Sequence, residues 1–180
     1  MRQIVLLRGI NLGARNRVSM PELRELLARA GFEDAHTYLQ SGNVVLSSDL
    51  TEKGLARKIK RVLADGLGLE LEVVVRTRHE LAKVVRLNPL GDMATNPKRY
   101  QVSFLSATPE PDVVEQLAEL AGPTERFVAI GRELYAWHPA GVARSRLWAR
   151  LAGKQLGVVA TARNWTTVTS LLELADDVKA

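Results

Sequence analysis

The segment LLRGINLGARNRVSM, residues 6–20, determines how the rest of the chain is organised. An apolar run that starts at Ile4 stops at Arg8, a polar loop follows, and a helix is predicted to begin after Ser19. A connection between a strand and a helix needs only a few residues. This loop is longer and carries three arginines, two asparagines and two glycines. It therefore predicts a site for an anionic or carbonyl-rich ligand.

The first half of the chain predicts the order strand, helix, strand, strand, helix, strand. Ser19 and Glu22 form a capping box at the start of the first helix, and Gly31 ends that helix. Residues 41–43, Ser-Gly-Asn, are a hairpin signal between the second and third strands. This order is that of a ferredoxin-like (βαββαβ) unit. Its predicted elements cover residues 3–8, 19–31, 35–39, 44–46, 55–66 and 71–75.

The second half repeats this order without repeating the sequence. A connecting helix with a capping box at Thr77–Glu80 is expected to end at Asn88-Pro89. The elements predicted after it cover residues 100–105, 108–120, 127–130, 134–137, a helix capped by Ser145, a short strand over 158–160 and a last helix capped by Asn164. The predicted fold class is α+β, with two ferredoxin-like halves in tandem, residues 1–76 and 99–180, joined by a connecting helix and loop over 77–98.

This topology predicts where the polar loops meet. The first and second strands of a ferredoxin-like unit run the same way, so the loop over 8–19 and the turn at 41–43 are expected at the same end of the first sheet. In the second half, the loops over 139–145 and 161–165 are expected at the end opposite the hairpin turn. If the halves pack head to tail, these ends form one cleft, in which Arg8 and Arg163 are expected to hold opposite sides of one anionic ligand.

The candidate ligand-binding residues are the arginines, amides and small residues of these loops. Forked guanidinium donors beside glycine backbone, close to a helix N-terminus, suit phosphate. Each motif also has a structural alternative, namely a solvated loop whose asparagines cap turns, a hairpin that needs positive φ angles, or a helix cap. The candidates are Arg8, Gly9, Asn11, Arg17, Ser41, Gly42, Asn43, Arg144, Ser145, Arg163 and Asn164.

Two further patterns are compatible with either binding or structure. Arg146, Arg150 and Lys154 recur at every fourth residue, which indicates either a solvated basic stripe or a phosphate-binding surface. Tyr135 and Trp137 share one face of a predicted strand. Such aromatics are either buried between the halves or, on an open sheet, stack on nucleic-acid bases.

Composition excludes several classes of protein. No apolar run approaches the ~18 residues of a membrane span, and the first residues are too short for the apolar region of a signal peptide. The absence of cysteine excludes thiol chemistry and suits a cytoplasmic protein. The three histidines lack metal-ligand spacing, and no catalytic triad or pair of carboxylates stands out, so no metal and no cofactor are predicted. A net charge of +5 favours an anionic partner.

Four motifs together resemble a bacterial family catalogued as domain of unknown function 1697. They are residues 6–20, Thr37–Val45, Asn88-Pro89 and Thr161–Val168. Two positions depart from the family pattern, because Arg146 replaces the usual Lys and Ala162 replaces a usual Thr. The resemblance covers essentially the whole chain and implies no settled activity.

The sequence therefore predicts a binding module for a phosphorylated or nucleic-acid ligand. The alternative is an enzyme that acts on a small anionic metabolite in a cleft between the halves, with arginine and asparagine as donors to the transition state. A continuous basic surface favours nucleic acid. A closed pocket with one perturbed carboxylate or histidine favours an enzyme.

Overall fold

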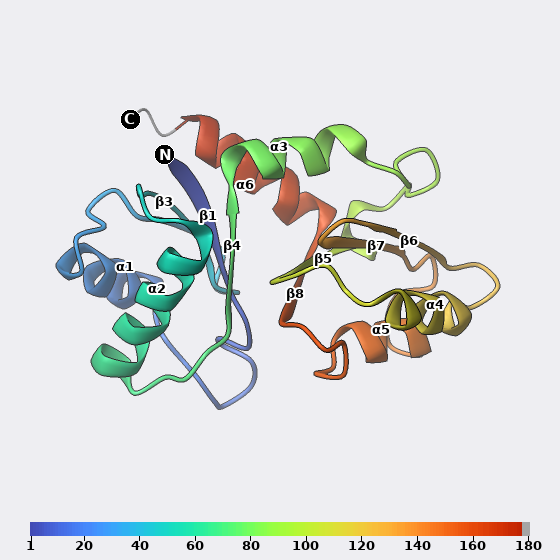
Figure 1. Cartoon of the computed structure of the whole chain (residues 1–180), viewed down its shortest axis with the longest axis horizontal. Helices are drawn as coiled ribbons and strands as arrows, with labels where there is room; N and C mark the ends of the chain where they lie inside the picture. Colours follow the sequence, from blue (N-terminus) through green and yellow to red (C-terminus); the bar gives the residue numbers. More distant parts are fainter. Residues whose placement is uncertain (178–180) are drawn as a thin grey trace. The chain divides into compact units, whose positions relative to one another are not determined.

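The computed structural model describes residues 1–177 and has an α+β architecture with two four-stranded antiparallel sheets (Figure 1). The elements of the first half are β1 (Arg2–Leu7), α1 (Met20–Arg29), β2 (His36–Tyr38), β3 (Asn43–Ser47), α2 (Glu52–Leu67) and β4 (Val73–Thr77). The chain continues through α3 (Arg78–Leu87) and a 3-10 helix (Pro97–Arg99). The elements of the second half are β5 (Tyr100–Leu105), α4 (Pro111–Leu120), β6 (Arg126–Ile130), β7 (Glu133–Trp137), α5 (Arg146–Leu151), β8 (Ala160–Asn164) and α6 (Trp165–Asp177).

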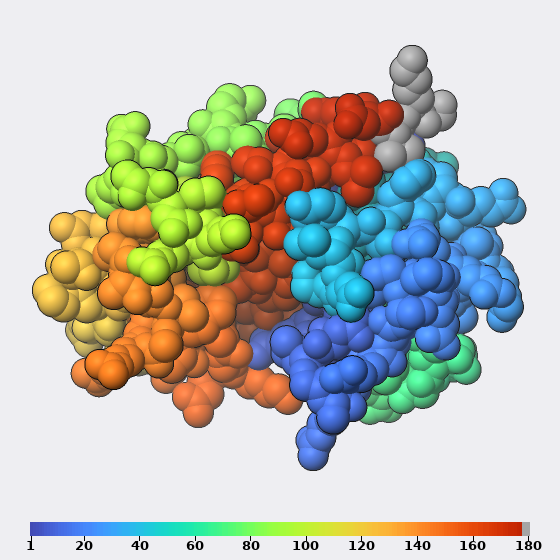
Figure 2. Space-filling view, turned by 180° about the vertical axis from the view of Figure 1, so that it is seen from behind, coloured from blue at the N-terminus to red at the C-terminus, as the bar shows by residue number. Residues whose placement is uncertain are grey.

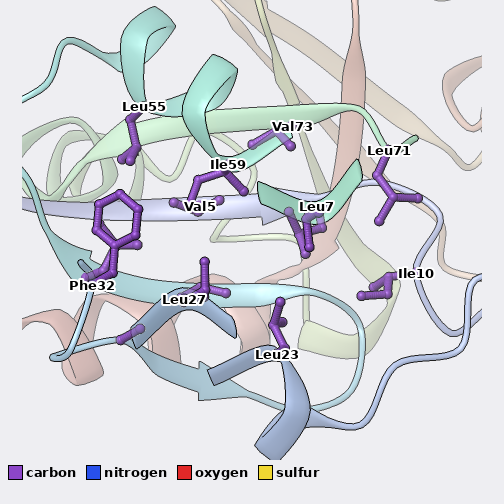
Figure 3. Close-up of a cluster of buried hydrophobic side chains, with 14 of the residues drawn as sticks. Val5, Leu7, Ile10, Leu23, Leu27, Phe32, Leu55, Ile59, Leu71 and Val73 are labelled. Atoms are coloured by element: carbon purple, nitrogen blue, oxygen red, sulfur yellow. The ribbon is translucent and has the colours of Figure 1, made fainter. Parts of the chain in front are cut away.

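The first sheet has the strand order β2-β3-β1-β4, so β1 is a central strand, as predicted. Its apolar run is buried because β1 pairs with β3 on one side and with β4 on the other. Helices α1 and α2 cover one face of this sheet (Figure 1). Figure 3 shows the core on that face, where the strands and helices contribute Val5, Leu7, Leu23, Leu27, Leu55, Ile59 and Val73.

The local signals at the helix ends act as predicted. The Ser19 hydroxyl accepts a hydrogen bond from the Glu22 N–H at 3.2 Å. At α3 the capping box is reciprocal, because the Glu80 N–H donates to the Thr77 hydroxyl at 3.2 Å while the Thr77 N–H donates to the Glu80 carboxylate at 2.8 Å. Each such cap satisfies backbone N–H groups that have no partner within the helix.

The second sheet has the order β6-β7-β5-β8, which repeats the order of the first. Strand β5 is central, as predicted, and the core under α4 and α5 includes Leu105, Leu117, Leu134, Leu147 and Leu151. The backbone forms two compact units. One comprises Met1–Ala82 with the segment that begins at Leu171, and the other comprises Lys83–Ser170.

The last strand lies later in the chain than predicted. The sequence indicated a strand over residues 158–160, with a loop over 161–165, but β8 runs from Ala160 to Asn164. It pairs with β5 from Ala160 opposite Leu105 to Asn164 opposite Gln101. The apolar pattern did not reveal this strand because Thr161 and Arg163 lie within it.

Among residues 1–177, no helix has the length and apolar character needed to cross a membrane.

Candidate anion-binding site

The two polar loops of the first half meet at one end of the sheet, as predicted. The Leu7 N–H donates to the Gly42 carbonyl at 2.8 Å, which joins the end of β1 to the hairpin turn. The Arg8 N–H donates to the Glu72 carbonyl at 2.9 Å, just before β4. We call residues 8–18 and 39–43 together the loop platform. Figure 2 shows the blue N-terminal part of this platform projecting at the lower edge of the view.

The side chain of Asn11 connects the two parts of the loop platform. Its amide nitrogen donates to the Val18 carbonyl at 3.0 Å and to the Gln40 carbonyl at 2.8 Å. Its oxygen accepts from the Val18 N–H at 2.8 Å. An asparagine amide has two N–H donors, and both are used here. Asn11 therefore supports the loop platform from within, and its side chain offers a ligand no further N–H donor.

The hairpin turn is equally constrained. Asn43 is fully buried, and its amide nitrogen donates to the Tyr38 carbonyl and to the Ser41 hydroxyl, each at 2.9 Å. Gly42 has a φ of +82°, and a Cβ on it would lie 2.6 Å from the Ile10 side chain and 2.7 Å from that of Leu7. Asn43 and Gly42 are thus explained by the turn itself, which was the structural alternative for this motif.

The outer part of the loop platform is exposed and basic. Residues 12–17 are all exposed, and Leu12 retains 70% of its accessible surface. The Nε of Arg17 donates to the Gly13 carbonyl at 2.8 Å, which orients its guanidinium. Arg15 has no hydrogen-bond or ion-pair partner within residues 1–177, whereas Arg8 is half-buried. The backbone at Gly9 and Gly13 is open, because a Cβ on either would contact nothing within 4 Å.

The second-half candidates Arg144 and Ser145 lie before α5. Arg144 is exposed, while Ser145 belongs to a hydrogen-bonded cluster. The Ser145 hydroxyl donates to the Glu125 carboxylate at 2.6 Å and accepts from the Trp148 N–H at 3.0 Å. His138 is fully buried, and its Nδ1 contacts the same carboxylate oxygen of Glu125. Ser145 is therefore both a helix cap and a part of this buried cluster.

Electrostatics keep the Glu125 carboxylate ionised. Burial alone raises its pKa, but hydrogen bonds from Ser145, from the Gly122 N–H and from His138 outweigh burial and lower the pKa below its ordinary value. In a catalytic triad the two imidazole nitrogens separate the carboxylate from the serine. Here both Glu125 and Ser145 lie on the Nδ1 side of His138, and the buried Nε2 has no hydrogen-bond partner in the part of the chain that the structure describes. The cluster therefore lacks the geometry of a nucleophilic triad.

Sequence reasoning named Ser145 but missed its partners Glu125 and His138, and it also missed Arg76. Glu125, His138 and Ser145 have no short-range spacing that would identify them, since the hairpin of β6 and β7 brings them together. Arg76 of β4 is only 1% exposed, and its guanidinium donates to the Val75 carbonyl at 2.9 Å. A charged residue within a run of valines was the available signal. Buried charge is uncommon and needs polar partners.

Arg163 is the clearest correction among the candidate residues. The sequence placed it in a loop after the last strand, but it lies within β8 and is 8% exposed. Its guanidinium donates to the Thr161 hydroxyl at 2.6 Å and to the Ala162 carbonyl at 2.8 Å. Burial lowers the pKa of this guanidinium to about 10. Asn164 caps α6, because its side-chain oxygen accepts from the Thr167 N–H at 2.9 Å.

Both aromatic residues of β7 are buried. Tyr135 and Trp137 of β7 are 0% and 7% exposed, so neither ring is presented to a nucleic-acid base. Trp165 stacks on Tyr100 with the ring centroids 4.7 Å apart, which makes it a packing residue. For Tyr135 and Trp137 the sequence had left two alternatives, burial between the halves and stacking on nucleic-acid bases.

Comparison with known proteins identifies the fold and the family. The fold is similar to that of the conserved bacterial protein SP0830 from Streptococcus pneumoniae, with a TM-score of 0.77 and 21% sequence identity over 97% of this chain and 98% of that chain. At this identity the likeness shows a shared fold alone. A search of curated proteins found no match. The description "Protein of unknown function (DUF1697)" belongs to a family that matches residues 1–135. Because this match covers well over half of the sequence, the chain belongs to that family.

Proposed function

We propose that the protein binds a phosphate-containing ligand on the loop platform. The observation that carries this proposal is the position of Asn11, whose three hydrogen bonds to Val18 and Gln40 tie the base of the loop to the hairpin turn. Beyond this base the loop leaves Arg15 and Arg17 exposed, beside glycines whose added Cβ would contact nothing. Binding loses less entropy when the groups that contact a ligand are already ordered.

The chemistry of the exposed groups favours phosphate. Guanidinium groups form paired, charge-assisted hydrogen bonds with phosphate oxygens. The Nε of Arg17 is occupied, whereas its terminal amino groups have no hydrogen-bond partner within residues 1–177. Gly9 and Gly13 have positive φ angles, and a Cβ on either would contact nothing within 4 Å, so a ligand can approach that side of their backbone closely. Their carbonyls are already used, because they accept hydrogen bonds from the Asn16 and Arg17 side chains. In this proposal Arg8 is a third contact, and Asn11 and Asn43 are supports.

We also infer that each half is a ferredoxin-like unit. The element order βαββαβ occurs twice, and both sheets have the same order of strands, with the first strand of each half central. This topology is relevant to the proposed site because it brings the end of the first strand next to the turn that follows the second strand.

The proposal is tested by calorimetric titration of inorganic pyrophosphate at low salt. A double variant, Arg15→Ala with Arg17→Ala, removes the two exposed contacts. The matched control is Arg57→Ala with Arg61→Ala, which removes the same charge from exposed positions of α2. Because one charge-assisted contact is worth roughly 1.5–3 kcal/mol, the loop variant should bind at least about ten times more weakly than wild type, and the control should change affinity no more than about twofold.

Two outcomes would overturn the proposal. One is the absence of saturable pyrophosphate binding by the wild-type protein. The other is an equal loss of affinity in both double variants, which would assign binding to net charge rather than to the loop platform. A parallel titration with a short single-stranded oligonucleotide distinguishes a small phosphorylated ligand from a nucleic acid. Release of phosphate from pyrophosphate would instead indicate an enzyme.

A further inference from the structure

A hollow with a volume of about 430 Å³ lies at the C-terminal end of α5. Five residues from the end of that helix and the turn after it line the hollow, namely Ala149, Arg150, Gly153, Lys154 and Gln155. This volume lies within the range of small-molecule sites, roughly 300–1,000 Å³. None of these residues belongs to the loop platform, so the hollow is independent of the proposed phosphate site.

The charge of Arg150 is only weakly compensated. Its terminal amino groups donate to the side-chain oxygens of Gln155 and Gln116, each at 3.3 Å. Its Nε is buried and has no hydrogen-bond partner among the described residues, 1–177. Both acceptors are neutral amides at long distance, and a guanidinium has five N–H donors to satisfy. The two glutamines therefore orient Arg150 without neutralising it.

Lys154 adds a second cation four residues after Arg150. It is exposed, and it has no hydrogen-bond or ion-pair partner within residues 1–177. Two neighbouring positive charges repel each other, whereas an anion placed between them would be attracted to both. The side of the hollow formed by Arg150 and Lys154 is thus suited to a phosphate group.

The backbone of Ala149 and Arg150, which also line the hollow, supplies hydrogen-bond acceptors. A Cβ on Gly153 would lie 3.3 Å from the carbonyl oxygens of both Ala149 and Arg150, so a side chain at this position would cover them. The Arg150 carbonyl accepts from the Gly153 N–H at 3.2 Å, which uses one of its two lone pairs. Carbonyls at a helix C-terminus accept hydrogen bonds and carry partial negative charge. They disfavour an anion and favour hydroxyl donors, which means that a ligand here needs an anionic end and a hydroxylated end.

We infer that this hollow binds a small phosphomonoester with free hydroxyl groups, its phosphate held by Arg150 and Lys154 and its hydroxyls donating to the last-turn carbonyls of α5. Glycerol 3-phosphate is a suitable probe, since it has both ends. Inorganic phosphate lacks the hydroxylated end, and glycerol lacks the anionic end.

The test titrates these probes into protein that carries Arg15→Ala and Arg17→Ala, so that the loop platform does not contribute. Lys154→Gln removes an exposed charge that has no ion-pair partner within residues 1–177, and it should weaken glycerol 3-phosphate binding about fivefold or more. Arg146→Gln is the matched control, because Arg146 is exposed on the same helix one turn earlier and does not line the hollow. It should leave affinity unchanged. Gly153→Ala should remove the preference for glycerol 3-phosphate over inorganic phosphate.

The outcomes that would overturn the inference are equally specific. Equal weakening by Lys154→Gln and Arg146→Gln would show that only surface charge matters. Equal affinity for glycerol 3-phosphate and inorganic phosphate in the parent protein would remove the role of the carbonyls. Absence of saturable glycerol 3-phosphate binding would refute the site itself, and it would leave the loop platform untouched because pyrophosphate binding is measured separately on the wild-type protein.

Discussion

Asn11 and Asn16 allow the loop platform to be tested one side chain at a time. Both have a left-handed backbone, with φ values of +54° and +53°. Glycine tolerates this conformation, so substitution by glycine removes only the side chain and some chain stiffness. Asn11 makes three side-chain hydrogen bonds, whereas the exposed Asn16 makes one, a 3.3 Å bond to the Gly9 carbonyl.

We expect Asn11→Gly to lower the free energy of unfolding by about 2 kcal/mol more than Asn16→Gly, because each lost hydrogen bond is worth roughly 1 kcal/mol. Urea denaturation of both variants measures the difference. The loop-platform proposal also requires Asn11→Gly to weaken pyrophosphate binding, since the loop would lose its order. Equal stability of the two variants would show that the Asn11 bonds do not hold the loop.

Arg163 tests whether a buried cation is needed for structure. Burial in β8 lowers its pKa to about 10, which reflects the cost of removing the charge from water. Replacement of a buried charge by an apolar side chain of similar size is often neutral or stabilising. We therefore expect Arg163→Met to retain the wild-type melting temperature. Arg163→Ala should lower the free energy of unfolding by about 2–4 kcal/mol, because the shorter side chain leaves a cavity. A loss in Arg163→Met as large as that in Arg163→Ala would show that the bonds to Thr161 and Ala162 outweigh desolvation.

At the scale of elements, Gly42 determines how closely the hairpin of β2 and β3 approaches β1. Gly42→Ala introduces both an unfavourable φ and contacts under 3 Å with Ile10 and Leu7. Gly131, in the hairpin of β6 and β7, has a φ of +59° and open space around it. Gly131→Ala therefore introduces the unfavourable φ but no close contact. We expect Gly131→Ala to lower the free energy of unfolding by about 1 kcal/mol. Gly42→Ala should lower it by about 2–4 kcal/mol, because overpacking adds to the backbone strain. Equal losses of melting temperature in the two variants would mean that the turn moves away from β1 at little cost in stability.

The cluster of Glu125, His138 and Ser145 joins β6, β7 and α5, and it predicts a dependence of stability on pH. The pKa of Glu125 is lowered in the folded state, so its contribution is fully present above the ordinary pKa of a glutamate and is lost as pH falls through the lowered value. Glu125→Gln should therefore be less stable than wild type at pH 7, and the difference should shrink below about pH 4. Chemical denaturation at pH 7, 5 and 3.5 checks this, and a difference independent of pH would contradict it.

Most of the elements were predictable because their signals are local. Ser19 with Glu22 and Thr77 with Glu80 mark helix starts, and an apolar run marks β1. The position of β8 was not predictable in this way. Its residues, Ala-Thr-Ala-Arg-Asn, include no large apolar side chain, and pairing with β5 buries the polar Thr161 and Arg163. The β-propensity of single residues predicts a strand poorly where pairing with a distant strand determines the structure.

The candidate site was predictable in place but not in the role of each residue. Chain topology brought the loop over 8–18 to the hairpin turn, as the Asn11 contact with Gln40 confirms. Sequence alone does not tell whether an amide faces a ligand or the protein, so Asn11 and Asn43 were grouped with the exposed arginines. The buried contact of Glu125 with His138 depends on long-range pairing and left no pattern in the sequence.

At the scale of the whole molecule, a net charge of +5 predicts how nucleic acid would bind. Tyr135 and Trp137 are buried, so binding would depend on charge rather than on base stacking. With about three phosphate contacts on a single strand, the slope of log affinity against log salt should be roughly −2, a loss of about 20-fold between 50 and 200 mM salt. We expect oligonucleotides of thymidine and of adenosine to bind alike, and the Arg15→Ala, Arg17→Ala variant to lose somewhat over one unit of slope. The Arg57→Ala, Arg61→Ala control should keep the wild-type slope. Mobility-shift titrations across this salt range measure all three proteins, and a flat dependence on salt or a strong preference for one base would show that recognition rests on contacts other than these arginines.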